Sequence, residues 1–184
     1  MQEPQIKHIP LSGTAAEQFF QRQLDDHSCG PACLATVAKI YGSTASYSEV
    51  RELLAPDPRT GTPQEVLAFQ ASKFAPQADF GAHTYNGGVA IANIMQEGEG
   101  HYVVFLAREG DLVLYYEPYY HEFVIAPLAS IVWDDGNWEP GSARESHWTV
   151  NFTALPDDSF EKWLSLAEQK LPPPPKQSFT QPRP

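Results

Sequence analysis

Cys29 stands at the start of an apolar stretch, six residues after Gln23, and this pair could form part of a covalent catalyst. A cysteine nucleophile needs an activated thiol, a donor for the oxyanion, a base, and a group that orients the base. The sequence also contains His101 at the start of another apolar segment, and Glu117 directly before Pro118. Together these residue types predict cysteine-dependent acyl transfer or hydrolysis.

The segment that begins at Cys29 has the composition of a buried helix. Residues 29–41 are rich in Ala, Leu, Val and Ile, and Gly42 follows as a helix-ending residue. A thiol in the first turn of a helix is favoured as the thiolate by the macrodipole and by free N–H groups. The alternative is that Cys29 is a small buried hydrophobic side chain, the common fate of a free cysteine. Cys33, one turn further on, is interpreted in that structural way.

Gln23 is the candidate oxyanion donor. Its side-chain amide would act beside the backbone N–H of Cys29, an arrangement that stabilises charge in a transition state. The alternative is an ordinary surface glutamine, since Gln18 and Gln21 lie close by in the sequence. The spacing of Gln23 from Cys29 favours the catalytic interpretation.

His101 and Glu117 are the candidate base and its orienting group. Residues 101–106 and 112–117 are rich in β-branched and aromatic residues, and the turn around residues 109–111 contains Gly110, so a hairpin is predicted. A hairpin that turns near Gly110 would place His101 opposite Glu117, within about 5 Å at Cβ. The carboxylate would then hold the imidazole tautomer. The alternatives are a solvated histidine at the strand edge and a carboxylate at the rim.

The remaining titratable residues are weaker candidates. His27 lies two residues from Cys29 and could shape the site, whereas Asp25 and Asp26 are interpreted as loop or capping carboxylates. His121 and His147 also lie near acidic or aromatic residues. We expect no metal and no cofactor, because two cysteines four residues apart are too few for a zinc site and the chain has no glycine-rich phosphate loop.

The elements that must position these residues suggest an α+β fold, with helices first and antiparallel strands after them. Two further helices are predicted to begin after capping residues: one after Ser46, ending at about Leu54, and one after Thr62, ending at about Phe74. Two more are predicted over residues 89–95 and 157–170. Further strands are predicted near 78–85, 123–125 and 147–152, with an acidic loop at 134–146. We expect an irregular lead-in at 1–18, one domain at 19–170, and a Pro-rich disordered tail at 171–184.

The overall composition narrows the classes of partner. The chain has 184 residues, 42% of them hydrophobic, and a formal net charge of -11. This charge argues against nucleic acid or an anionic membrane as a partner, because phosphate binding needs a basic surface. The sequence contains no run of 18 apolar residues and does not open with a signal peptide, so a cytoplasmic location is expected, or an exported one if a signal was trimmed. The oligomeric state is left open.

The joint pattern resembles a known family. Gln23-x5-Cys29-Gly30-Pro31-Ala32, followed by His101-Tyr102-Val103-Val104 and an acidic residue before proline, resembles the bacteriocin-processing cysteine peptidases over roughly residues 20–135. These are papain-like enzymes that cut double-glycine leader peptides and are usually fused to export transporters. The resemblance implies a papain-like fold, with N-terminal helices packed on an antiparallel sheet, and a peptide or protein substrate. It implies the following roles: Cys29 as nucleophile, His101 as base, Glu117 as orienting group and Gln23 at the oxyanion hole.

Two departures from the family pattern matter. Glu117 stands where the family has Asp, and its extra methylene should weaken activity more than abolish it, since the orienting group is the least demanding member. The sequence also contains neither transporter helices nor a Walker motif, so the chain resembles stand-alone relatives, and residues 136–184 have no recognised counterpart. Three functions stay open: a cysteine peptidase that processes leaders, an acyltransferase or amidase with the same chemistry, and a non-catalytic peptide-binding module.

Overall fold

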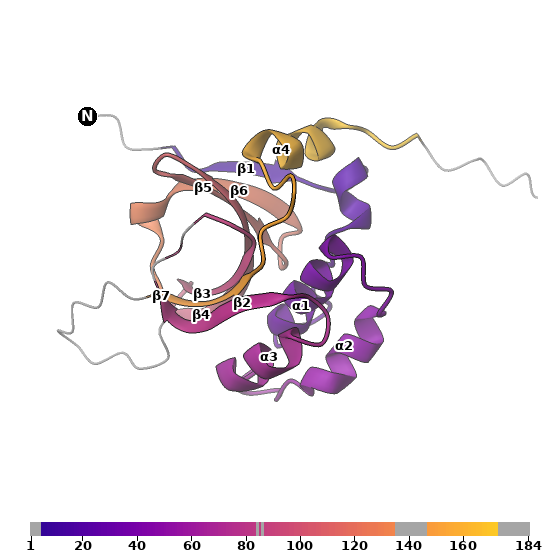
Figure 1. Ribbon diagram of the computed structural model, residues 1–184, viewed down its shortest axis with the longest axis vertical. Helices are drawn as coiled ribbons and strands as arrows, with labels where there is room; N and C mark the ends of the chain where they lie inside the picture. Colours follow the sequence, from indigo (N-terminus) through magenta and orange to yellow (C-terminus); the bar gives the residue numbers. More distant parts are fainter. Residues whose placement is uncertain (1–4, 84, 86, 135–146, 173–184) are drawn as a thin grey trace, which may run out of the picture.

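The computed structural model describes residues 5–83, 85, 87–134 and 147–172, and its strands form one curled antiparallel sheet (Figure 1). The sheet has seven strands in the order β1-β6-β5-β4-β3-β7-β2. The strands are β1 (Lys7–Pro10), β2 (Gln77–His83), β3 (Ala90–Gln96), β4 (Glu99–Glu109), β5 (Leu112–Glu117), β6 (Glu122–Pro127) and β7 (His147–Phe152). Each neighbouring pair is antiparallel.

Three helices from the N-terminal half lie together beside the sheet (Figure 1). They are α1 (Cys29–Ile40), α2 (Tyr47–Leu54) and α3 (Gln64–Ala71). The fourth helix, α4 (Phe160–Glu168), packs near the short 3-10 helix η1 (Ala15–Gln18) and contacts β4, and a second short 3-10 helix, η2 (Leu128–Ser130), follows β6. The predicted α+β class, with N-terminal helices packed on an antiparallel sheet, is therefore confirmed. Among the described helices, none combines the length and the apolar character needed to cross a membrane.

Helix α1 is the central element of the larger hydrophobic core. Every residue from Cys29 to Ala38 is buried, and α1 packs directly against β4. The side chains of this core come from α1, α2, α3, α4 and one face of the sheet. A second cluster, which includes Tyr85, Val103 and Phe105, occupies the other face. Burial of α1 on all sides explains its nearly uniform apolar sequence and fixes the position of its N-terminus.

The helix starts follow the predicted capping chemistry in part. Ser46 and Glu49 form a capping box at α2, in which Glu49 N donates to Ser46 Oγ at 3.2 Å and Ser46 N donates to Glu49 Oε2 at 2.7 Å. The prediction that Thr62 caps α3 is wrong, because Pro63 occupies the N-cap position. Helix α3 also ends at Ala71, three residues before the predicted end.

The predicted helix over residues 89–95 is wrong, because this segment is strand β3. Its residues from Ala90 to Ile94 are all buried, so the sequence lacks the alternation that identifies a half-exposed strand. A two-residue turn with positive φ at Glu97 (51°) and Gly98 (88°) joins β3 to β4. Such a turn is typical of a hairpin and was the local signal for a strand.

The ends of the chain also differ from the sequence-based expectation. The lead-in that was expected to be irregular contains β1, which pairs with β6 at the edge of the sheet. The segment 157–170 forms α4, as predicted, with Trp163 buried. The acidic loop predicted at 134–146 and the tail predicted at 171–184 fall almost entirely on residues 135–146 and 173–184, which lie outside the described residues.

Candidate active site

Cys29 is the first residue of α1 and is 8% exposed. The preceding Ser28 directs its hydroxyl to the loop, where Oγ accepts from the backbone N–H groups of Leu24 and Asp25, each at 3.3 Å. No side chain of the described residues caps the first turn of α1. The N-terminal dipole and the backbone N–H of Cys29 therefore act on the thiol and on any group bound beside it.

His101 lies near the start of β4 and pairs with a buried carboxylate. Its Nε2 is 2.6 Å from Oε1 of Glu117, which is 3% exposed. Glu117 also accepts from the backbone N–H of Tyr119 at 3.0 Å and from that of Tyr120 at 2.6 Å. A carboxylate that accepts three hydrogen bonds is held in one orientation. Because Nε2 faces Glu117, Nδ1 is the ring nitrogen left for Cys29.

The pKa of His101 reflects this pairing. Burial alone would lower it, but hydrogen bonds and charge interactions with Cys29 and Glu117 outweigh burial and raise the pKa to about 9. The imidazole is therefore protonated at neutral pH. An imidazolium beside a thiol at a helix N-terminus favours the thiolate. The structure therefore places a cationic imidazole beside the Cys29 thiol at the N-terminus of α1.

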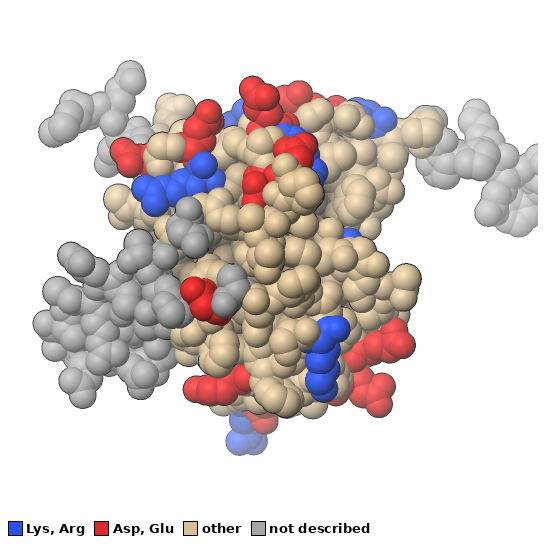
Figure 2. All heavy atoms as spheres, viewed as in Figure 1, with Lys and Arg blue, Asp and Glu red and all other residues tan. Residues whose placement is uncertain are grey.

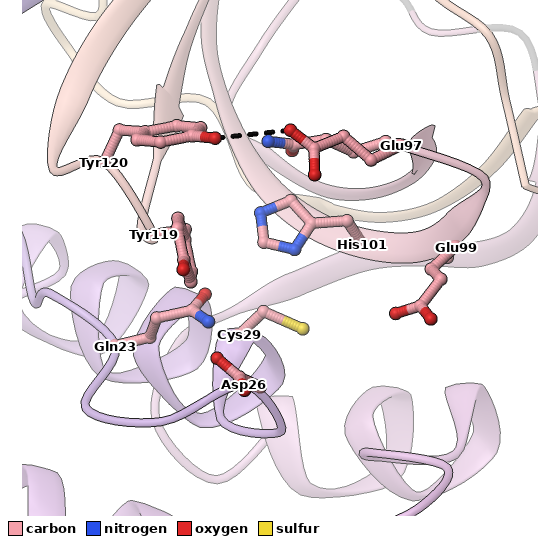
Figure 3. Close-up of a pocket in the computed structure, with 10 residues that line it drawn as sticks. Gln23, Asp26, Cys29, Glu97, Glu99, His101, Tyr119 and Tyr120 are labelled. Atoms are coloured by element: carbon pink, nitrogen blue, oxygen red, sulfur yellow. Dashed lines mark hydrogen bonds between the residues drawn. The ribbon is translucent and has the colours of Figure 1, made fainter.

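Gln23 lies beside Cys29 (Figure 3). Its side chain is 7% exposed, and Nε2 donates to the carbonyl of Asp25 at 2.9 Å, which leaves a second amide hydrogen for another acceptor. Its backbone N–H donates to the carbonyl of Pro118 at 3.1 Å. This bond ties the Gln23 segment to the turn that follows Glu117. The candidate oxyanion donor and the orienting carboxylate thus belong to one hydrogen-bonded unit.

These residues adjoin a cleft of about 390 Å³. The loop before α1 forms one wall with Gln23, Asp26 and Cys29, and the β3–β4 turn forms another with the segment from Gln96 to His101 (Figure 3). Tyr119 and Tyr120 close a third side, and the Tyr120 hydroxyl donates to Glu97 Oε1 at 3.4 Å. Gln23, Cys29 and His101 therefore share one cleft, and Glu117 lies behind His101.

The predicted register of the hairpin requires a correction. Val104 lies opposite Tyr116, with a β-bulge between Phe105 and Ala107, so His101 does not lie directly opposite Glu117. The hairpin turns at Gly110 and Asp111, about one residue later than the predicted centre, and this moves the pairing by two positions. His101 and Glu117 are diagonal neighbours, a separation that long side chains can bridge. The side chain of Glu117 spans this diagonal.

Most of the weaker candidates have structural roles. Cys33 is fully buried and donates from Sγ to the carbonyl of Tyr102 at 3.2 Å. Burial, reinforced by Cys29 and Glu117, raises the pKa of the Cys33 thiol well above its usual range, so the thiol stays neutral. His121 is buried against the Tyr116 hydroxyl at 2.8 Å, and burial lowers its pKa.

The aspartates and remaining histidines lie around or away from the cleft. Asp25 pairs with Arg51 at 2.5 Å and accepts from the backbone N–H of His27 at 3.1 Å, which makes it a loop carboxylate as predicted. His27 is not among the described residues that line the cleft, whereas Asp26 is. The side chain of His147 lies outside the described residues. No group of three metal-ligating side chains occurs in the described part of the chain.

Sequence reasoning missed several residues that line the cleft: Gln96, Glu97, Glu99, Tyr119 and Tyr120. A signal for them was present, since Glu97 and Glu99 flank a glycine just before His101, and the two tyrosines follow Glu117-Pro118 directly.

On the face shown in Figure 2, Lys and Arg side chains stand among Asp and Glu near two ends of the view, with uncharged atoms between them. That face carries no continuous basic area among the described residues.

Known proteins resemble this chain in sequence and in fold. The sequence profile of the Peptidase C39 family matches residues 18–122, a span that includes all four candidate site residues. The fold is similar to that of the peptidase domain of Streptococcus ComA, a bi-functional ABC transporter involved in a quorum sensing pathway. The two share 21% sequence identity and a TM-score of 0.55, over 72% of this chain and 97% of the ComA domain. No curated protein matches the sequence.

Proposed function

The chain belongs to the Peptidase C39 family and is a cysteine peptidase, and we propose that Cys29 is its nucleophile. In this proposal His101 transfers the proton, Glu117 orients His101, and Gln23 stabilises the oxyanion. One observation carries the assignment. The contact between Glu117 and His101 continues through the imidazole to Cys29, at the uncapped N-terminus of α1.

The first half of the reaction forms an acyl-enzyme. The Cys29 thiolate adds to the carbonyl carbon of the scissile peptide bond, and the carbonyl oxygen becomes an oxyanion. The free amide hydrogen of Gln23 and the backbone N–H of Cys29 donate to this oxyanion, a type of contact worth about 3 kcal/mol per donor in the transition state. As the C–N bond breaks, the imidazolium of His101 gives its proton to the leaving amine.

The second half releases the acid. His101, now neutral, takes a proton from water, and the resulting hydroxide adds to the thioester carbonyl. The C–S bond then breaks, the carboxyl product leaves, and the thiolate and imidazolium are restored. Glu117 holds Nε2 on the side facing away from the substrate and keeps it protonated, so Nδ1 is the nitrogen that gives the proton to the amine and then takes one from water.

We further propose that the substrate is a leader peptide that ends in two glycines. This rests on the family and on the resemblance of the Gln23–Cys29 and His101 motifs to leader-processing peptidases. Tyr119 and Tyr120, which line the cleft, are 46% and 52% exposed, so an extended peptide that lies along them can reach Cys29. Small residues at the scissile bond would let its carbonyl approach the buried thiol of Cys29.

The experiment is a cleavage assay with a synthetic double-glycine leader peptide, followed by mass spectrometry of the products. The proposal predicts a cut after the second glycine, lost in Cys29→Ala and in His101→Ala and retained in Cys33→Ala. Full turnover by Cys29→Ala would rule out this nucleophile. Products that carry an added amine in place of water would identify an acyltransferase, and peptide binding with an unreactive Cys29 would identify a binding module.

A further inference from the structure

The charged side chains that line the cleft are unusual in having one sign. Apart from His101, those contributed by the described residues are all acidic: Asp26, Glu97 and Glu99. Asp26 belongs to the wall that carries Cys29, whereas Glu97 and Glu99 belong to the wall that carries His101 (Figure 3). Carboxylates therefore flank the nucleophile from two sides. Arg22 lines an adjoining hollow together with Asp26.

These three carboxylates are not neutralised within the described part of the chain. The ion pairs found there are His8–Glu122, Arg51–Asp25 and His101–Glu117, and none of them includes Asp26, Glu97 or Glu99. Glu97 has only the long contact with the Tyr120 hydroxyl. All three side chains are exposed and can turn towards a bound ligand. Unpaired like charges on facing walls repel one another and attract a cation.

A second observation points to a ligand that donates hydrogen bonds. Gln23 is 7% exposed and lines the same cleft, yet its Oε1 has no partner among the described residues. A buried acceptor without a partner is costly, so a donor that arrives with the substrate would restore the lost interaction. Together with the three carboxylates, this places four groups with acceptor oxygens in the lining of the cleft around Cys29.

We propose that the peptidase selects substrates with a Lys or Arg within a few residues of the scissile bond, through Asp26, Glu97 and Glu99. This inference rests on the proposed function, because it assigns the substrate of the same cleft. A basic side chain would lie between the carboxylates of the two walls and leave the small residues of the cleavage site at Cys29. Each exposed carboxylate should contribute a few-fold to kcat/KM, and the three together on the order of 10-fold or more.

Peptide kinetics test the selection directly. A double-glycine peptide is varied one position at a time on both sides of the bond, with Lys, Gln or Glu at each. We expect at least one position where Lys gives about a 10-fold higher kcat/KM than Glu, with the ratio falling at high salt. The triple variant Asp26→Asn/Glu97→Gln/Glu99→Gln should lose this ratio. The control Glu52→Gln/Glu109→Gln/Glu168→Gln changes the net charge equally at exposed positions away from the cleft and should keep it.

A second readout does not depend on peptide cleavage. Two methanethiosulfonate reagents of similar size, one carrying a trimethylammonium and the other a sulfonate, form a mixed disulfide with Cys29. Each rate is divided by the rate of the same reagent with a free thiol in solution. The cationic reagent should then react with Cys29 about 10-fold faster than the anionic one, and in the triple variant the two rates should differ by no more than about 3-fold. Equal rates in the unmodified protein, or a preference that survives in the triple variant, would overturn the charge selection. If the reagents discriminate but no peptide is cut, the proposed peptidase function fails and the acidic binding site stands.

Discussion

His101 Nε2 lies 2.6 Å from Glu117 Oε1, although the strands that carry the two residues do not pair them directly. The contact crosses the sheet diagonally and is buried on the carboxylate side. The backbone N–H groups of Tyr119 and Tyr120 hold the same carboxylate, and the carbonyl of Pro118 holds the segment of Gln23. The turn after Glu117 therefore sets the positions of both the imidazole and the candidate oxyanion donor.

Replacing Glu117 with Gln tests the orienting role. The amide keeps the size of the side chain but removes the charge and places an N–H group against a backbone donor. We expect kcat/KM to fall by on the order of 10- to 100-fold, with a smaller change in KM, since the imidazole loses its fixed tautomer. Steady-state kinetics with a leader peptide provide the measurement. Unchanged kcat in a fully folded Glu117→Gln protein would remove Glu117 from the mechanism.

The raised pKa of His101 predicts a pH dependence of stability. Its pKa is higher in the folded protein, about 9, than its ordinary value of 6.5. Protonation therefore stabilises the fold, and this contribution is complete below about pH 6.5 and lost as the pH rises through about 9. Urea unfolding between pH 6 and pH 10 should show a declining free energy of unfolding, with a flatter profile in His101→Gln. Parallel profiles for the two proteins would contradict the pairing.

Gln23→Ala tests the oxyanion donor. Loss of one donor should lower kcat by about 10²- to 10³-fold while KM changes little, because the contact strengthens only in the transition state. Gln18→Ala, at an exposed residue of η1, is the matched control and should keep full activity. The same loss in both variants, or none in Gln23→Ala, would show that Gln23 does not act on the oxyanion. Thermal unfolding checks that Gln23→Ala remains folded.

Cys33 should be dispensable for the chemistry. Its thiol is fully buried and bonds to the carbonyl of Tyr102, so Cys33→Ala should keep kcat within about 2-fold. The variant should lose stability by about 1 kcal/mol through the small cavity that it leaves. Activity assays and urea unfolding measure the two effects. A large loss of activity with unchanged stability would give Cys33 a role that its burial does not suggest.

Much of this arrangement could be predicted because its signals are local. The apolar run after Cys29 predicts α1, the capping box at Ser46 predicts α2, and the β-branched and aromatic residues on both sides of the Gly110 turn predict the hairpin of β4 and β5. The register of that hairpin depends on a β-bulge and on the position of the turn. Counting residues outwards from an assumed turn centre takes neither of these into account. The sequence alone therefore predicts that His101 and Glu117 lie close together. It does not predict that they are diagonal neighbours.

The errors have physical causes that can be traced to particular segments. Strand β3 was assigned as a helix because Ala90–Ile94 is buried on both faces, which removes the two-residue alternation. The pairing of β1 with β6 joins residues more than a hundred positions apart, so no local sequence pattern indicates it. The acidic cleft depends on the same kind of long-range packing, because Asp26 and Glu97, which line it together, are 71 positions apart in the sequence.

The most direct test of the proposed site is the rate of Cys29 alkylation by iodoacetamide at neutral pH, with the labelled residue located by mass spectrometry. The account predicts fast labelling at Cys29 with Cys33 untouched, and a rate at least about 10-fold lower in His101→Ala, because the imidazolium that favours the thiolate is gone. Cys33→Ala should label at the unmodified rate. Equal rates for His101→Ala and the unmodified protein would contradict the pairing of Cys29 with His101, and with it the proposed mechanism.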